Sequence, residues 1–181
     1  MKLLFVRHGQ TDFNKNKLPQ GQEIDAPLNE TGIQQAEEAA KSLPNDIDFI
    51  IASPLKRASQ TAEILNQKLK IKLEFNNDVK ELRYGSLAGK SWSEIEVITG
   101  DKDIHEKDTE IIFDYRKFGG DSAEDLKQRV AKFLNEVKEK YPNKTILVAT
   151  HSGVIDVMHI LFPQKEKGVV SNASIHEFYF E

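Results

Sequence analysis

The stretch "LLFVRHGQT" at residues 3–11 decides how this chain folds. Four apolar residues, the pattern of a buried β-strand, run directly into Arg7-His8-Gly9 and two polar residues. In an open α/β sheet, the side chains that bind ligands lie beyond the carboxyl ends of the strands. We therefore expect residues 2–6 to form a buried strand, with Arg7 and His8 at its functional end.

Two further apolar runs end in the same way, because Asp48–Ala52 is followed by Ser53 and Thr145–Ala149 by Thr150-His151. Helical periods alternate with these strands, and such alternation indicates a mainly parallel sheet. The fold class is thus α/β, with three layers and helices on both faces of the sheet. The other predicted elements are the helices Thr31–Leu43, Leu55–Leu69, Ser91–Thr99, Ser122–Tyr141 and Ser152–Leu161 and the strands Ile71–Phe75 and Ser174–Phe180.

The organisation along the chain favours one domain over residues 1–181, because there is no repeat, low-complexity segment or linker. Residues 82–118 are the least regular part and are interpreted as a small irregular lid or insert within this domain. Their charged run, Asp101–Asp108, is expected to be solvated, as charge runs usually are. We therefore expect a small, open pocket beside this insert.

The composition excludes several classes of function. The net charge is −4 and charged residues of both signs make up 30% of the chain, so no overall field would hold nucleic acid or an anionic membrane. The absence of cysteine excludes disulfides, thiolate metal sites and cysteine nucleophiles. No apolar run approaches the ~20 residues of a membrane span. We expect a cytoplasmic protein that binds neither nucleic acid nor membrane, and that holds any anion by a local cluster of cations.

Four residues could form such a cluster. If the strands are parallel neighbours, Arg7, His8 and His151 converge on one crevice, and Arg57 can point into it from the first turn of its helix. Two arginines, two imidazoles and nearby helix N-termini suit a phosphoryl group. Taken singly, a histidine at a strand end is more often structural, and an arginine early in a helix is usually solvated. Their joint placement favours phosphoryl chemistry.

Motifs over nearly the whole chain resemble one protein family and occur in its order. The segment Arg7-His8-Gly9-Gln10-Thr11-Asp12-Phe13-Asn14 resembles the signature RHGxTxxN, and residues 53–62, SPLKRASQTA, are similar to SPLxRAxQTA. Further similar segments are Gln20-Gly21, Asp25–Gly32, Glu81–Gly85, Gly120–Ser122 and Ala149–Val154. The family is the histidine phosphatase superfamily, which includes the cofactor-dependent phosphoglycerate mutases.

This resemblance implies a phosphoglycerate mutase-like fold and a set of catalytic roles. His8 would be the nucleophile that forms a phosphohistidine, with its other ring nitrogen held by a backbone carbonyl near Gly9. The side chains of Arg7, Arg57 and His151 would hold the phosphoryl oxygens. Glu81 would protonate the leaving oxygen and then activate water, which requires a raised pKa. Without the resemblance, Glu81 would read as an exposed loop carboxylate.

Other residues are expected to bind substrate or to remain outside the site. The predicted substrate-binding residues are Thr11, Asn14, Gln20, Ser53 and Ser152, and for Gln20 and Ser53 a hydrogen bond to the loop backbone is an equal alternative. Ser152 departs from the family pattern, which usually has glycine there. Asn172 is a further candidate for approach to the pocket. The remaining histidines and the tryptophan are read as surface or packing residues: His105, His159, His176 and Trp92.

The resemblance favours a phosphatase over a mutase. Mutases of the family carry a substantial insertion between the glutamate and the motif that corresponds to Gly120–Ser122, whereas Glu81 and Gly120 are only about forty positions apart here. The expected partner is a small phosphorylated metabolite or inorganic phosphate, with no cofactor and no metal, in a monomer or dimer. The alternatives are a phosphoglycerate mutase-type phosphoryl transferase, a non-catalytic phosphate-binding protein, and a metal-dependent phosphohydrolase, which no HExxH or paired-Asp motif supports.

Overall fold

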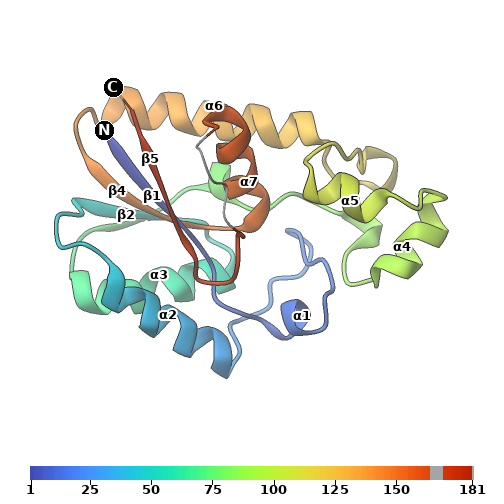
Figure 1. Cartoon of the computed structure of the whole chain (residues 1–181), viewed down its shortest axis with the longest axis horizontal. Coiled ribbons are helices and arrows are strands. Elements are labelled where there is room, and N and C mark those ends of the chain that lie inside the picture. Colours follow the sequence, from blue (N-terminus) through green and yellow to red (C-terminus); the bar gives the residue numbers. More distant parts are fainter. Residues whose placement is uncertain (164–168, 181) are drawn as a thin grey trace.

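The computed structural model describes residues 1–163 and 169–180. Within this part of the chain, strands form one sheet in the order β3-β2-β4-β1-β5, and Figure 1 shows it as the middle layer. The β5 strand is antiparallel to β1 and the other neighbours are parallel. The strands are β1 (Lys2–Arg7), β2 (Phe49–Ala52), β3 (Leu73–Phe75), β4 (Thr145–Thr150) and β5 (Ile175–Tyr179).

The strand order brings the sequence motifs together. Between β1 and β2 the chain passes over the position that β4 fills, so β4 lies between them. In the register of the sheet, Arg7 is opposite Thr150, and Ala52 is opposite Ala149. The residues that follow these strands, His8, His151 and Ser53, therefore emerge at the same edge, where the order of the strands reverses.

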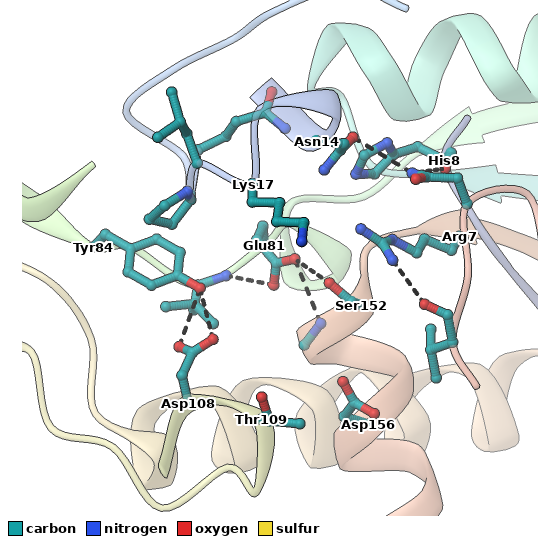
Figure 2. Close-up of a pocket in the computed structure, with 18 of the residues that line it drawn as sticks. Arg7, His8, Asn14, Lys17, Glu81, Tyr84, Asp108, Thr109, Ser152 and Asp156 are labelled. Carbon is teal, nitrogen blue, oxygen red and sulfur yellow. Dashed lines mark hydrogen bonds between the residues drawn. The ribbon is translucent and has the colours of Figure 1, made fainter. Parts of the chain in front are cut away.

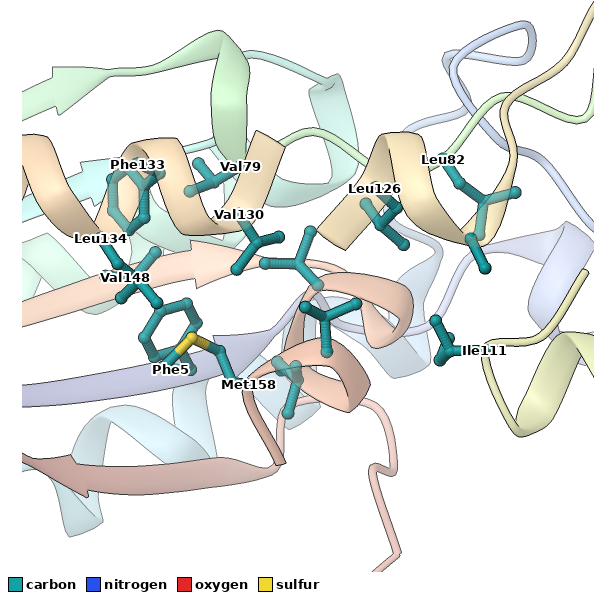
Figure 3. Close-up of a cluster of buried hydrophobic side chains, with 14 of the residues drawn as sticks. Phe5, Val79, Leu82, Ile111, Leu126, Val130, Phe133, Leu134, Val148 and Met158 are labelled. Atoms are coloured by element: carbon teal, nitrogen blue, oxygen red, sulfur yellow. The ribbon is translucent and has the colours of Figure 1, made fainter. Parts of the chain in front are cut away.

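Helices cover both faces of the sheet, as Figure 1 shows, and the predicted three-layer α/β fold is confirmed. Alternate strand residues point to opposite faces. Leu4 and Leu147 pack with α2 (Glu30–Ser42) and α3 (Lys56–Leu69). On the other face, Phe5 and Val148 pack with α6 (Ala123–Lys140) and α7 (Ser152–Leu161), and Figure 3 shows this cluster with Val130 and Met158. Each of these fully buried side chains contributes about 1.5–3 kcal/mol to the free energy of unfolding.

Helix α6 begins where the sequence predicts it. Ser122 is the N-cap, and its hydroxyl accepts a hydrogen bond from the backbone nitrogen of Asp125 at 3.2 Å. The Asp125 carboxylate in turn accepts from the Ser122 backbone nitrogen at 2.8 Å, which completes the capping box. These contacts satisfy two of the donors that a helix start leaves unpaired.

The irregular segment 82–118 contains two short α-helices, α4 (Trp92–Thr99) and α5 (Ile104–Thr109), and the 3-10 helices η2 (Gly85–Leu87) and η3 (Arg116–Phe118). Its apolar side chains extend the core on the α6 face, with Leu87 and Tyr115 fully buried. The expectation that Asp101–Asp108 is solvated holds for its exposed side chains, such as Asp103 and Glu106, but not for Ile104, which is buried, or for Asp108, which is partly buried at a pocket. Neither α5 nor the four-residue α1 (Asp12–Lys15) was predicted, because such short helices show little apolar periodicity.

Among the residues that the structure describes, every helix is too short or too polar to cross a bilayer.

Candidate active site

A cavity of about 700 Å³ lies at the edge of the sheet where β1 and β4 end. Figure 2 shows that side chains from the β1 end, the α1 loop, α5 and α7 point into it. This volume is larger than the small pocket expected from the sequence. The residues that line it include Arg7, His8, Asn14, Lys17, Gln20, Arg57, Glu81, Tyr84, Trp92, His105, Asp108, Ser152, Asp156 and Asn172.

His8 has one ring nitrogen fixed and the other available. Its Nδ1 lies 2.7 Å from the carbonyl oxygen of Gly9, and this acceptor holds the proton on Nδ1. Burial, together with the positive charges of Arg57 and Arg7, lowers the pKa of His8 well below 6.5. The ring is therefore neutral near pH 7 and carries a free electron pair on Nε2.

The backbone around His8 is held by close packing. A Cβ atom on Gly9 would lie 2.3 Å from the carbonyl oxygen of Gly32 in α2, so only glycine allows this approach. The Gly9 nitrogen also donates to the hydroxyl of Thr61 in α3 at 3.1 Å. The loop that carries His8 is thus fixed against two helices, and a ring on it has little freedom to move.

Two guanidinium groups flank His8, that of Arg57 buried and that of Arg7 partly buried. Arg7 donates to the carbonyl oxygen of Val170 at 2.7 Å, and Arg57 donates to those of Gly21 at 2.7 Å and Ile24 at 3.1 Å. The Nε atom of each has no hydrogen-bond partner among the described residues. Burial lowers the pKa of both groups, yet arginine stays protonated in proteins. The site therefore holds two positive charges whose hydrogen-bonding capacity is only partly used.

Glu81 is a buried carboxyl group beside the start of α7. Its Oε2 lies 3.4 Å from both the Ser152 hydroxyl and the Gly153 nitrogen, and its Oε1 accepts from the Leu82 nitrogen at 3.0 Å. Burial raises the pKa of Glu81 above 4.5, although the backbone donors of Leu82 and Gly153 and the two arginines oppose the rise. A Cβ atom on Gly153 would lie 2.5 Å from Oε1, so glycine makes room for the carboxylate.

His151 is fully buried beside His8 and is not itself part of the cavity lining. The ring centroids are 5.2 Å apart in an edge-on arrangement. The Nε2 of His151 lies 2.8 Å from the Ser53 hydroxyl oxygen, which also accepts from the Leu55 nitrogen at 3.3 Å. The Nδ1 of His151 is buried without a partner in the described part of the chain. Ser53 is fully buried against His151 and is not part of the cavity lining.

The predicted substrate-binding residues divide into two groups. Asn14, Gln20 and Ser152 line the cavity, whereas Thr11 is fully buried outside it. Thr11 caps α1, and its hydroxyl and backbone nitrogen contact the Oδ1 of Asn14 at 3.0 and 3.1 Å. Thr11 thus orients Asn14. Asn172 also lines the cavity and donates to the carbonyl oxygen of His8 at 3.1 Å.

Ser152 is accommodated where the family usually has glycine. It is the first residue of α7, and its φ is not in the left-handed region, so the backbone there does not require glycine. Its hydroxyl points toward Glu81, as Figure 2 shows. The departure from the family motif therefore adds a donor near the carboxylate without straining the chain.

Reasoning from the sequence missed much of the pocket wall. Lys17, Tyr84, Asp108 and Asp156 line the cavity but lie in no motif that we identified, and Trp92 and His105 line it in addition to packing together. One signal was available, because Asp156 follows Ser152 by four residues and shares its helix face. Nothing in the charged run around Asp108 distinguishes it from its solvated neighbours. In the described residues, no group of three or more His, Asp or Glu side chains has the arrangement of a metal site.

Comparison with known proteins identifies one family. The family model described as "Histidine phosphatase superfamily (branch 1)" matches residues 3–180. The chain is 34% identical over 154 residues to an uncharacterized phosphatase, PhoE, of Bacillus subtilis, which covers 84% of this chain and 72% of that protein. It is 30% identical over 190 residues to a metal-independent phosphoserine phosphatase of Arabidopsis thaliana, which covers 97% and 74%. A mutant phosphoserine phosphatase of Entamoeba histolytica, solved with phosphoserine, has a TM-score of 0.81 at 26% identity and covers 99% of this chain and 91% of that one.

Proposed function

The chain belongs to the histidine phosphatase superfamily, and on this premise we propose that it hydrolyses small phosphomonoesters through a phosphohistidine at His8. The observation that carries the proposal is the state of the His8 ring. Its Nδ1 is tied to the Gly9 carbonyl, its pKa is lowered, and it lines a cavity together with Arg7 and Arg57. A neutral imidazole beside two guanidinium groups has what attack on a phosphate dianion requires.

In the first step, the Nε2 of His8 attacks phosphorus while the bond between phosphorus and the ester oxygen breaks. Arg7 and Arg57 offset the charge on the phosphoryl oxygens. The His151 ring packs against that of His8, and its Nδ1, which has no partner among the described residues, would donate to an oxygen of the group bonded to His8. Protonated Glu81 gives its proton to the leaving oxygen, so the alcohol departs neutral. The burial that raises the pKa of Glu81 favours this protonated form.

In the second step, water attacks the phosphorus of phosphohistidine. Glu81, now ionised, takes a proton from the water while the bond between phosphorus and Nε2 breaks, which regenerates neutral His8 and releases inorganic phosphate. The two steps return every group to its starting state. No cofactor is needed, and we expect full activity in the presence of EDTA.

Substrate range separates this proposal from its closest alternative. The relatives named above include phosphoserine phosphatases, and this supports a small phosphorylated metabolite as substrate. A mutase must return the phosphoryl group to a second molecule before water reaches it. A mutase would therefore isomerise phosphoglycerate in the presence of 2,3-bisphosphoglycerate with little release of inorganic phosphate.

The test is hydrolysis of p-nitrophenyl phosphate and a panel of phosphorylated metabolites by the purified full chain, with and without EDTA. We expect His8→Ala to lower kcat/KM by about 10³-fold or more, because the nucleophile is lost. Quenching with alkaline denaturant during turnover should trap protein-bound phosphate that is stable to base and lost in acid, as expected of phosphohistidine, in the wild type only.

A matched variant, His176→Ala, removes a histidine that lies outside the cavity, on β5. It should keep the activity and the trapped phosphate. Thermal unfolding of both variants checks that each is folded. Unchanged hydrolysis by His8→Ala, or activity that EDTA abolishes, would contradict the proposal, and isomerisation without phosphate release would identify a mutase.

A further inference from the structure

The cavity has a second end that the proposed reaction does not use. Asp108, in the last turn of α5, and Asp156, one turn after Ser152 in α7, both line it. Figure 2 shows the two carboxylates on the same side of the cavity, with Thr109 between them, across from Asn14 and Lys17. We call Asp108, Asp156 and the aromatic side chains beside Asp108 the acidic wall.

Asp108 retains hydrogen-bonding capacity. Its Oδ1 accepts from the hydroxyls of Tyr84 at 3.1 Å and Tyr115 at 2.9 Å, and its Oδ2 lies 3.0 Å from the same Tyr84 hydroxyl. A carboxylate offers about four acceptor positions, so two hydroxyl donors do not saturate it. The side chain is partly exposed to the cavity. An incoming donor can therefore reach Oδ2.

Asp108 has no ion-pair partner among the described residues. Burial, with the nearby charges of Glu81 and Asp156, raises the pKa of Asp108 to about 7, and the two tyrosine hydroxyls offset this only in part. Lys17 is on the opposite wall (Figure 2). A cation bound next to Asp108 would offset the repulsion between its carboxylate and those of Glu81 and Asp156.

Two independent features of the cavity lining also suit a ligand that donates hydrogen bonds and carries positive charge. Trp92 and His105 are stacked, with ring centroids 4.3 Å apart, and both line the cavity next to Tyr84. Aromatic faces attract cations electrostatically. The Oε1 of Gln20 is a buried acceptor in the cavity lining, with no hydrogen-bond partner among the described residues. A donor on the ligand would satisfy it.

We propose that the acidic wall binds a protonated amine on the alcohol portion of the substrate, so that this site prefers phosphate esters of amino alcohols. The inference rests on the proposed phosphatase function and adds the substrate class. Arg7 and Arg57 would hold the phosphate at one end, and the ammonium group would lie between Asp108 and the Trp92 ring at the other. An ester with an apolar tail would leave Asp108 without a cation and lose this interaction.

The experiment compares isosteric substrates. Aminoalkyl phosphates, from aminoethyl to aminopentyl, are each paired with the alkyl phosphate that carries a methyl group in place of the ammonium group. The readout is the ratio of kcat/KM within a pair, because it cancels changes at the phosphate end. We expect the ratio to reach about tenfold or more, and to peak at the chain length that spans the cavity.

The variants are Asp108→Asn and Asp156→Asn, with Glu106→Gln as the matched control. Glu106 is an exposed acid on the same helix as Asp108 and does not line the cavity. Asp108→Asn should lower the peak ratio about fivefold or more, because it removes the charge and keeps the shape of the side chain. Glu106→Gln should leave the ratio unchanged. Thermal unfolding reports whether the loss of a tyrosine hydrogen bond has unfolded the wall.

The possible outcomes separate the two proposals. A wild-type ratio near or below one at every chain length, with hydrolysis intact, overturns the amine proposal and leaves the phosphatase proposal standing. A ratio that survives in Asp108→Asn, Asp156→Asn and the double variant also overturns it, because the preference then arises elsewhere. Absence of hydrolysis for every ester, including p-nitrophenyl phosphate, overturns both.

Discussion

The two ends of the cavity are built from different kinds of structure. At the phosphate end, Arg7 and His8 extend a strand that is hydrogen-bonded on both sides, and Ser152 begins a ten-residue helix. At the acidic wall, Asp108 lies in a six-residue helix within the irregular segment 82–118. The sheet cannot shift one strand without disrupting its neighbours, whereas a short helix on the surface can change with little effect on the sheet. The proposed reaction thus lies at the more rigid end, and the proposed choice of substrate at the more variable one.

The contrast predicts that changes at the phosphate end have the largest effects, beginning with Glu81→Gln. The alkoxide that leaves from an alkyl phosphate is strongly basic and needs a proton. We therefore expect kcat/KM for alkyl phosphates to fall about 10²–10⁴-fold. p-Nitrophenolate needs little protonation, so its release in the first turnover should largely survive. The phosphohistidine should then accumulate because no base activates water. A rapid-quench burst of p-nitrophenol, followed by slow turnover, is the measurement.

The same variant has a signature in the pH profile. Neutral His8 is required, and its pKa is well below 6.5, so wild-type activity should persist into mildly acidic solution. Hydrolysis of alkyl esters requires protonated Glu81. Their kcat/KM should therefore fall as the pH rises through the pKa of Glu81, which lies above 4.5. This alkaline limb should be absent in Glu81→Gln, and comparing the two proteins cancels the titration of the substrate. An identical limb in the variant would contradict the assignment of Glu81.

A smaller effect is expected one layer behind the phosphate end, at Ser53. Its oxygen accepts from the Leu55 nitrogen, which leaves the hydroxyl proton to donate to the Nε2 of His151. The proton of His151 would then be on Nδ1, the atom without a partner among the described residues. We expect Ser53→Ala to lower kcat/KM by about 10-fold through loss of this tautomer, as with other residues that orient a functional histidine.

The measurement for Ser53 is the ¹⁵N chemical shift of the two His151 ring nitrogens. The wild type should show a protonated Nδ1, and Ser53→Ala should show a mixture of tautomers. Ser53→Thr keeps a hydroxyl and should retain the wild-type tautomer. A wild-type spectrum with the proton on Nε2 would contradict this positioning role, whatever the activity of the variant.

Much of the fold followed from the sequence because the buried strands and long helices carry strong periodicity. The strand that ends at Ala52 and the helix that ends at Leu69 agree with the structure at those termini, and the Ser122 capping box is present. Periodicity does not give the order of strands, so the parallel pairing of β1 and β4 was a condition of the argument about His8 and His151, and the structure shows this pairing. Short helices such as α5 were missed because fewer than two turns give no readable pattern.

In the candidate site, too, some residues could be predicted from the sequence and others could not. Arg7, His8 and Arg57 lie in contiguous motifs, and the structure brings them to one cavity. Ser53 and Thr11 lie in the same motifs but are buried behind it, because a motif also contains the residues that hold the functional ones. Asp108 was missed because its partners, Tyr84 and Tyr115, come from other parts of the segment and meet it only in the folded chain.

The smallest expected effect concerns Ile111, which fixes the end of α5 beside Asp108. Ile111 has a φ of 56°, in the left-handed region that a β-branched residue rarely adopts. Its nitrogen donates to the Asp108 carbonyl at 3.2 Å and the Ile112 nitrogen donates to the Lys107 carbonyl at 2.9 Å, the Schellman pattern in which glycine is usual. The Ile111 side chain is buried and lines the cavity, and this burial offsets the backbone strain.

Ile111→Gly separates the two contributions. Relief of the left-handed strain should return about 1–2 kcal/mol, and loss of the buried side chain should cost about 2–5 kcal/mol, so the free energy of unfolding should fall by about 1–3 kcal/mol. Lys70→Gly is the matched control, because Lys70 caps α3 with a φ of 52° and is exposed, so only the strain is relieved and stability should rise by about 0.5–1 kcal/mol. Since Ile111 holds the helix of Asp108, its variant should lose more activity toward aminoalkyl phosphates than toward p-nitrophenyl phosphate. An equal loss toward both would mean that the acidic wall and the phosphate end are mechanically one unit, against the contrast drawn here.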